Sequence, residues 1–583
     1  VFLEGIPVPL LYHFGGLTSF FNSRLLERID FFPGNFSVRY GRKMGGILEV
    51  STRDPLGIYQ DRGVHGVAEF GVIDASLLAE FPLGPNAAGA AAVRRSTIDF
   101  VFNNLPDDTF TVQTAPVYYD YQGLVTWRPS PRDRVRFMMY GSSDRFDLIL
   151  PESLGDDPEV VGGVDLTTRF HFGQLGWDRQ INDKTELDID FMIGTTVLDF
   201  SLGQTIAFNA RFNQIIGRAE LRHRASSRVR LIAGVDLFVS PLRLTYTGPQ
   251  PEQQEGNPGG DPLTGSGDEV TGFSINATAS RPAFYLESDM QLHERLQVVM
   301  GLRLDHAKEI GSFAFNPRMS AILTLFEGFR LKAGFGIFSQ PPEFNESSPD
   351  IGNPDLDWIH STHTGFGFDY QIAEGIRVGV EGFYKHLWDR VVGTEQQTPP
   401  FFENGGIGRI YGMEVSAKIA PVRGRRFFGY LSYTLSRSER LDRPDDPTAE
   451  WRLFDFDQTH IFTLAAVVKL PRRWEIGATL RLVSGNPRTP FVNSANDVEN
   501  GVYYGIPGDV NSQRNPLFNR LDFRISKAWQ FETWKLALFL DIQNVYNQTN
   551  QEGLIYPYDY NEANAVPING LPFIPALGIR GEL

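Results

Sequence analysis

Two histidines, His360 and His363 in the stretch WIHSTHTG, are the residues whose type and spacing come nearest to a metal site. Imidazole nitrogens are common ligands of transition metals. The surrounding residues fit a β-strand, however, and residues three apart on a strand face opposite sides. The two rings therefore cannot hold one metal ion without a distorted backbone, and we expect no metal site here.

Signatures of catalysis are missing from the sequence. It contains no GxSxG elbow, no HExxH pair, no Walker loop and no cysteine nucleophile. The formal net charge of −16 at pH 7 argues against binding to the phosphates of nucleic acid. We therefore predict a protein that is not an enzyme, has no catalytic residues or cofactor, and does not bind nucleic acid.

Composition favours a protein built from strands and turns. The chain has 583 residues, with 58 Gly, 46 Phe, 20 Tyr and 8 Trp, which is too aromatic for a disordered chain or a helical array. The sequence contains no run of eighteen apolar residues that could form a transmembrane helix. A closed β-barrel, by contrast, crosses a membrane with about ten alternating residues per strand. The absence of cysteine fits an exported protein.

Alternation of apolar and mixed positions dominates the chain from Gly66 onward, as in a strand with two different faces. In RVRLIAGVDLFV the apolar face carries Val229, Leu231, Ala233, Val235, Leu237 and Val239. The opposite face includes Arg228, Arg230 and Asp236. A soluble sandwich would alternate too, so this pattern alone leaves both classes open.

Connection lengths separate the two classes. Outer-membrane barrels have short periplasmic turns and long outer loops, whereas sandwiches show no such parity. We place about twenty-two strands between residue 64 and the C-terminus. The gaps after even-numbered strands are all tight: GPNA, PSP, NDK, SSR, HE, EG, EG, PVRG, PR and FE. Most of the others are long, so the sequence predicts an all-β, transmembrane, 22-stranded antiparallel outer-membrane β-barrel.

Tryptophan positions give a partly independent indication. Five of them lie within a few residues of the tight turns: Trp127, Trp177, Trp474, Trp529 and Trp534. A periplasmic aromatic girdle would place them there. Turns of any β protein can also use tryptophan as a packing lid, so both interpretations stay open.

The front of the chain does not continue the barrel pattern. A barrel of about twenty-two strands has a lumen that must be plugged. Residues 1–55 read as a small α+β unit, in which LTSFFNSRLLERIDFFPGN forms a short helix that runs into a strand. We expect this unit to be a plug, incomplete at its start, followed by a linker at 56–63 and the barrel at 64–583.

Three plug stretches, LEGIPVP, ERIDFFPGN and YGRKMGGILEVST, resemble the plug domain of TonB-dependent outer-membrane receptors, with Glu4 where Asp is usual. Barrel stretches follow in the family's order, among them FNPRMSAILTL, YGMEVSAK, DQTHIFTLAAVVKLP and LFLDIQNVYNQTN. The stretch from PLLYHFGG to RYGR is similar to a group of these receptors found in myxobacteria and their relatives. The chain departs from the family in two respects. We expect the TonB box, signal peptide and first part of the plug to lie upstream of Val1, and the last strand ends on Leu583 instead of an aromatic residue.

The resemblance implies where functional residues lie. Ligand contacts come from the plug apex and upper wall, which makes Tyr12, His13 and Phe14 candidates, although they could equally pack the plug against the barrel. Tyr40, Gly41, Gly45 and Gly46 would form the plug-to-barrel turn, with the last two glycines allowing a tight bend.

The resemblance also implies a function and partners. It predicts active uptake, powered by the TonB–ExbB–ExbD complex, of a scarce solute such as a siderophore, a metal complex or another bulky nutrient. Outer-membrane lipid and lipopolysaccharide would surround the barrel. A passive porin-like channel and a surface binding or signalling receptor are the alternatives.

Two further features have open interpretations. The run NPDL before His360 is similar to a motif of haem receptors but is generic to the wider family, so haem stays an alternative. Acidic residues in the outer loops could steer a cationic ligand, or could provide solubility and divalent-cation bridges to lipopolysaccharide. These residues are Asp156, Asp157, Glu159, Asp165, Glu252, Glu255, Asp261, Asp268, Glu269, Asp442, Asp445, Asp446 and Glu450.

Overall fold

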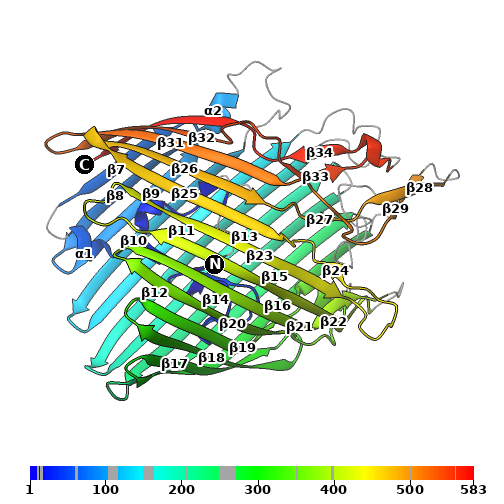
Figure 1. Cartoon of the computed structure of the whole chain (residues 1–583), viewed down its shortest axis with the longest axis horizontal. Coiled ribbons are helices and arrows are strands. Elements are labelled where there is room, and N and C mark those ends of the chain that lie inside the picture. Colours follow the sequence, from blue (N-terminus) through cyan, green and yellow to red (C-terminus); the bar gives the residue numbers. More distant parts are fainter. Residues whose placement is uncertain are drawn as a thin grey trace.

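The structure is a computed structural model that describes residues 1–8, 12–13, 18–59, 63–102, 116–148, 163–203, 206–248, 271–349, 352–394, 400–497, 502–557 and 560–583. Long strands run side by side around the molecule and the N-terminal segment lies among them (Figure 1). Among these residues, no helix is long and apolar enough to cross a membrane.

The described part of the chain forms a closed antiparallel barrel of 22 wall strands, as predicted. The last wall strand pairs with the first, from Gly578 opposite Gly71 to Glu582 opposite Val67. The wall strands are β7 (His65–Gly71), β8 (Asp74–Gly84), β9 (Ala87–Ser96), β10 (Val117–Ser130), β11 (Asp133–Leu148), β12 (Val164–Asn182), β13 (Thr185–Leu202), β14 (Ile206–Arg224), β15 (Val229–Gly248), β16 (Thr271–His293), β17 (Leu296–Ala307), β18 (Ser312–Phe326), β19 (Phe329–Gln340), β20 (Ile359–Ala373), β21 (Ile376–Gly393), β22 (Phe402–Ile419), β23 (Phe427–Leu441), β25 (His460–Leu470), β26 (Trp474–Val483), β31 (Phe518–Gln530), β32 (Lys535–Gln543) and β35 (Ile574–Glu582).

Nine of the ten turns predicted to be tight leave two to four residues between their strands, and the turn between β22 and β23 leaves seven. The hairpins β12–β13 and β16–β17 each leave two residues between the strands. In the turn between β18 and β19, Gly328 has a φ of 83°, a conformation that glycine adopts without strain. All these turns lie at one end of the barrel because the strands alternate in direction. We call this the turn end, and the opposite end the loop end.

The two faces of the wall differ as the alternation predicted. Leu231, Val235 and Leu237 of β15 are exposed on the outside of the barrel. Between them in sequence, Ile232 is buried and Asp236 binds N-terminal residues in the lumen. Trp127, Trp474, Trp529 and Trp534 are exposed near the tight turns, in agreement with an aromatic girdle at the turn end.

A four-stranded sheet in the lumen forms the centre of the N-terminal unit, which we call the plug. Its order is β2 (Ile6–Pro7), β1 (Phe2–Leu3), β6 (Ile47–Thr52) and β5 (Leu26–Phe32). A small hairpin, β3 (Tyr12–His13) with β4 (Thr18–Ser19), lies beside it. Leu3, Ile6, Phe20 and Phe21 are buried against wall residues that include Tyr140, Phe170 and Phe172.

Several local predictions need correction. The helix expected before β5 is only a 3-10 turn, η1 (Ser23–Leu25), because the following residues extend to pair with β6. Strand β9 ends at Ser96 and is followed by helix α2 (Ile98–Phe102), a short helix in a region for which we predicted only strands and turns. The segment expected to be a linker begins within α1 (Pro55–Tyr59).

The segments at the loop end contain small elements that alternation did not predict. Strands β28 (Phe491–Asp497) and β29 (Val502–Pro507) form one hairpin. Strands β33 (Gln551–Ile555) and β34 (Val566–Asn569) form another. The remaining short elements are β24 (Arg452–Leu453), β27 (Pro487–Arg488), β30 (Gln513–Arg514), α3 (Phe344–Ser347) and η5 (Glu562–Asn564), with η4 (Pro471–Arg473) in the β25–β26 turn at the turn end.

Candidate functional site: the interface between plug and wall

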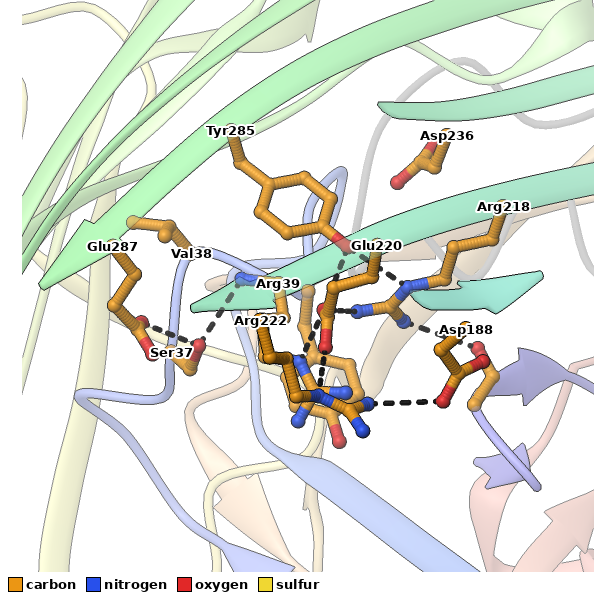
Figure 2. Close-up of polar contacts among 12 residues, drawn as sticks. Ser37, Val38, Arg39, Asp188, Arg218, Glu220, Arg222, Asp236, Tyr285 and Glu287 are labelled. Carbon is orange, nitrogen blue, oxygen red and sulfur yellow. Dashed lines mark hydrogen bonds and ion pairs between the residues drawn. The ribbon is translucent and has the colours of Figure 1, made fainter. Parts of the chain in front are cut away.

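The plug turn that precedes β6 meets a cluster of charged wall residues (Figure 2). Arg39 Nε donates a hydrogen bond to Glu220 Oε2 of β14 at 2.7 Å. The Glu220 carboxylate is buried and also accepts from the Tyr285 hydroxyl at 2.8 Å and from Arg222 Nε at 2.7 Å. Ser37 Oγ donates to Glu287 Oε2 of β16 at 2.6 Å. Two residues of one plug turn are thus bonded to two wall carboxylates.

A second ionic group lies beside the first, on β15 and β17 of the same wall. Arg42 Nη2 pairs with Asp236 Oδ1 of β15 at 2.5 Å, and Arg303 Nη2 of β17 pairs with Asp236 Oδ2 at 2.6 Å. The Arg303 side chain is completely buried and also pairs with Asp305. Its Nη1 donates to the plug carbonyl of Val38 at 3.2 Å. One wall carboxylate therefore joins a plug cation and a wall cation.

Arg318 of β18 holds the plug backbone. Its Nη1 donates to the carbonyl oxygens of Ser37 at 2.8 Å and Tyr40 at 2.7 Å. Its guanidinium carbon lies 4.9 Å from the ring centre of Phe36 and 4.1 Å from that of Phe338. Arg318 is buried and has little contact with water. The two cation–π contacts partly replace that hydration.

The first plug turn is attached to a neighbouring part of the same wall. Glu4, with a φ of 51°, accepts from Thr52 Oγ1 at 2.7 Å and pairs with Arg136 of β11. Nearby, Glu49 of β6 accepts from the Gly5 amide at 2.8 Å and from the Tyr40 hydroxyl at 3.1 Å. Burial raises the pKa of Glu49, and these hydrogen bonds offset only part of that effect.

The plug hairpin is attached through His13. Its Nδ1 lies 2.8 Å from Asp144 Oδ1 and its Nε2 lies 3.2 Å from Asp120 Oδ2. The imidazole is fully buried and stacks on the Tyr118 ring at 4.2 Å. Burial lowers the pKa of His13, but the hydrogen bonds to Asp120 and Asp144 outweigh it and raise the pKa above its ordinary value.

The apex residues predicted to bind a ligand therefore lie in different surroundings. His13 is enclosed by the wall, which is the packing alternative of the sequence analysis. Tyr12 beside it is 47% exposed. Phe14 lies outside the described residues. The ligand-binding role of this group stays a prediction.

The four predicted turn residues, Tyr40, Gly41, Gly45 and Gly46, have different structural roles from those that the sequence analysis gave them. Tyr40 is buried, and a side chain at Gly41 would collide with the Arg303 guanidinium. Gly45 faces open space, and a Cβ on Gly46 would lie 2.9 Å from the Phe32 carbonyl oxygen. The left-handed residue of this turn is Arg42, with a φ of 58°, and not a glycine. The turn precedes β6 and so lies inside the plug, before the chain passes to the wall.

The two histidines of β20 lie apart, as their spacing predicted. His363 is buried on the lumen side, where it stacks on Phe338 at 4.1 Å. His360 stacks on Trp388 at 5.3 Å. In the described part of the chain, no cluster of three or more His, Cys, Asp or Glu residues could hold a metal ion.

Few of the acidic loop residues can be placed. Asp442 pairs with Arg390 at 3.3 Å and with Arg452 at 2.6 Å, so its charge is neutralised within the protein. Asp165 lies 3.9 Å from Arg145, and Asp446 accepts from Thr448 Oγ1 at 2.7 Å. Eight of the others lie outside the described residues: Asp156, Asp157, Glu159, Glu252, Glu255, Asp261, Asp268 and Glu269.

The interface also encloses polar space. A cavity of about 710 Å³ lies between the plug and strands β10–β14, towards the turn end. Its lining includes Glu4, Arg39, Glu49, Arg136 and Asp190. Charged groups of both signs thus face one another across the gap between plug and wall.

Sequence reasoning missed Ser37, Arg39 and Arg42. The sequence did contain a signal for the two arginines. Arg39 and Arg42 flank Tyr40–Gly41 in a unit that was expected to lie inside the barrel. Buried cations need carboxylate partners, so both residues could have been predicted to pair with acidic residues of the wall. Asp236 was assigned correctly to the polar face of its strand. The pairing of plug cations with wall carboxylates depends on the rotation of the plug in the lumen. Local sequence patterns contain no information about that rotation.

Comparison with known proteins identifies the family. The chain matches the family described as TonB dependent receptor-like, beta-barrel, over residues 83–545. The chain belongs to this family. This TonB-dependent receptor is therefore a protein of the bacterial outer membrane. It is 25% identical over 278 residues to an iron-regulated outer membrane virulence protein of Vibrio cholerae serotype O1. That match covers 42% of the chain and 41% of the relative, so it spans about two fifths of that protein.

Solved structures share the receptor's fold. The outer membrane transporter YddB from Escherichia coli superposes with a TM-score of 0.68 at 12% identity, covering 100% of this chain and 90% of that one. The ferripyoverdine receptor of Pseudomonas aeruginosa, bound to ferripyoverdine, gives a TM-score of 0.72 at 12% identity, covering 100% and 79%. The family and these neighbours are receptors and transporters.

Proposed function

We propose that this receptor takes up a scarce, bulky solute across the outer membrane by TonB-dependent active transport. A ferric siderophore is the first candidate, because the similar structures include a receptor bound to ferripyoverdine and the curated relative is named as iron-regulated. The proposal rests chiefly on one observation, the ionic attachment of the plug to the lumen wall.

Such an attachment suits a seal that opens and closes. A plug fixed only by an apolar core would expose that core whenever it moved. Ion pairs such as Arg39–Glu220 can exchange their partners for water at a modest net cost, because water forms hydrogen bonds with both separated charges. A pull on the plug from the periplasmic side would then open a polar path along the wall.

Uptake in whole cells tests the proposal. Cells that express the receptor would be given radiolabelled iron on a panel of ferric siderophores, with and without a functional TonB gene. We expect receptor-dependent accumulation for at least one siderophore, and its loss without TonB or after a protonophore. Accumulation that is independent of TonB and of the proton-motive force would contradict the proposal and favour a passive channel.

A surface binding or signalling receptor makes a different prediction. Such a protein would hold the ligand at the cell surface without transferring it. Separating the spheroplast fraction from the outer-membrane fraction after exposure to labelled ligand distinguishes the two. Label confined to the outer membrane in energised cells would favour the surface receptor.

A further inference from the structure

Three residues form one row across neighbouring wall strands, towards the turn end of the lumen. Arg136 of β11 is directly opposite Gly176 of β12, and Gly176 is directly opposite Asp190 of β13. Arg136 and Asp190 both line the polar cavity between plug and wall. A glycine thus separates a cation from a carboxylate in a row that faces the plug.

Arg136 pairs with the plug but is not fully used by it. Its Nη1 pairs with Glu4 Oε2 of the first plug turn. Its Nη2 lies 3.6 Å from Asp178 Oδ1 and 3.9 Å from Asp190 Oδ1. Its Nε has no hydrogen-bond partner in the described part of the chain. This guanidinium therefore has N–H groups that remain available for a second carboxylate.

Asp190 is a buried carboxylate with little support from its neighbours. Its side chain is only 8% exposed, and its Oδ1 accepts no hydrogen bond from the described residues. Arg218, directly opposite on β14, is engaged by Glu220 at 3.2 Å and by the Tyr285 hydroxyl at 3.0 Å. A buried carboxylate oxygen without a hydrogen bond is unfavourable, so Asp190 gains from a cation that comes closer.

Gly176 leaves the space for such an approach. A Cβ at this position would lie 2.8 Å from Asp190 Oδ1, 3.4 Å from Arg136 Nη2 and 3.5 Å from Arg136 Nε. The guanidinium and the carboxylate therefore face each other over the glycine, where a side chain would stand between them. Shortening the present 3.9 Å separation to a hydrogen bond of about 2.9 Å needs a shift of about 1 Å.

We propose that Asp190 is a second partner for Arg136, which the arginine takes when the plug turn that carries Glu4 leaves the wall. Arg136 breaks its ion pair with Glu4 and forms charge-assisted hydrogen bonds with Asp190 across Gly176. The exchange keeps a largely buried charge paired and so lowers the cost of releasing the plug. Asp190 and Gly176 are thus positioning residues for the release step. This inference rests on the proposed function, in which the plug is released during uptake.

The sign of one substitution separates this role from simple support of Arg136. Asp190→Asn removes the partner of the released state and leaves the Arg136–Glu4 pair of the docked state in place. We expect the opening equilibrium of the first plug turn to fall about tenfold, the equivalent of about 1.4 kcal/mol, so that the plug is held more tightly. A carboxylate that only supported the docked arginine would loosen the plug when removed.

Hydrogen exchange of peptides from residues 1–8 and 47–54 measures this equilibrium in purified receptor, without ligand or TonB. A heat-modifiable gel shift first verifies that each barrel is folded. Asp541→Asn is the matched control, because Asp541 of β32 is a wall carboxylate that pairs with Arg524 of the neighbouring strand at 2.7 Å. This control should stay within about twofold of the wild type.

Two further variants assign the effect to movement of Arg136. Gly176→Ala places a methyl group between the guanidinium and Asp190, and should lower the opening equilibrium several-fold. Gly173→Ala on the same strand is its control, because a Cβ there meets nothing within 4 Å. In an Arg136→Gln background, Asp190→Asn should have no effect, because the group that exchanges partners is gone.

Any of three results would overturn the proposal. The first is an opening equilibrium in Asp190→Asn that equals or exceeds that of the wild type. The second is a fall that persists in the Arg136→Gln background. The third is an unchanged or greater opening in Gly176→Ala. The assay contains neither TonB nor ligand, so one of these results together with TonB-dependent uptake would overturn the partner exchange and leave the proposed function standing.

Discussion

Gly41 and Gly45 lie four residues apart in one plug turn, yet their surroundings differ. A side chain at Gly41 would meet the buried guanidinium of Arg303, whose position is fixed by Asp236 and Asp305. Gly45 faces open space. The first glycine is required for close packing of plug and wall, and the second is not.

Alanine at each position tests this difference. Gly41→Ala should destabilise plug docking by about 1–3 kcal/mol, the usual cost of forcing a methyl group into a packed site. Gly45→Ala should change it by less than about 0.5 kcal/mol. Hydrogen exchange of peptides from residues 18–59 reports the opening free energy of the plug. Equal effects of the two substitutions would show that Arg303 does not constrain the turn.

His13 predicts a pH dependence of the plug hairpin. Its pKa is raised in the docked state, so its contribution to docking is fully present below its ordinary value of about 6.5 and is lost as the pH rises through the raised value. Arg94, which pairs with Asp120 at 2.7 Å, keeps its charge throughout this range and leaves the sign unchanged.

Hydrogen exchange of residues 18–25 between pH 5.5 and 9.5, corrected for intrinsic rates, measures this effect. Protection in the wild type should fall as the pH rises. A His13→Gln variant should show weaker protection at low pH and no such fall. The same pH profile in both proteins would assign the titration to another group.

At the scale of elements, strand alternation and turn length predicted the wall well, because both are local properties of the sequence. RVRLIAGVDLFV has a continuously apolar outer face on β15, and the tight turns occur where Gly, Pro and Asn interrupt the pattern. The helix expected before β5 failed because pairing with β6 overrides local helix preference.

The plug–wall contacts could not be predicted in the same way. Arg42 and Asp236 are separated by 194 residues, and Arg39 and Glu220 by 181. Their pairing depends on the rotation of the plug within a closed wall. The sequence predicted the turn at residues 40–46 and the polar face of β15 correctly. It pointed to the glycines of that turn as the important residues and missed Arg39 and Arg42 beside them.

Buried and partly exposed contacts of this interface should differ in strength. Asp236→Asn removes the charge that both Arg42 and the fully buried Arg303 need, and should destabilise docking by about 2–3 kcal/mol. Arg39→Gln should cost about 1 kcal/mol or less, because Arg39 is 31% exposed and Glu220 keeps Arg218 and Arg222 as partners. The urea dependence of plug hydrogen exchange gives both values. A larger cost for Arg39→Gln would reverse this ranking.

The whole molecule combines a rigid wall with a plug that we propose to be detachable. The wall is closed by hydrogen bonds from β35 to β7 and is apolar outside, so it stays fixed in the membrane. The plug has its own small sheet and contacts the wall through charged side chains as well as through the apolar cluster around Phe20. Transport, in this account, is the reversible release of those contacts.

Reversible cross-linking of the plug to the wall tests that claim most directly. The chain contains no cysteine, so Ser37→Cys with Glu287→Cys, at positions whose native side chains lie 2.6 Å apart, provides one unique thiol pair. A short bifunctional maleimide with a cleavable disulfide would join them in whole cells, with each single variant as a control. We expect uptake of labelled ligand to stop when the pair is cross-linked, to return after reduction, and to be unaffected by the reagent in either single variant. Undiminished uptake through fully cross-linked receptors would contradict it.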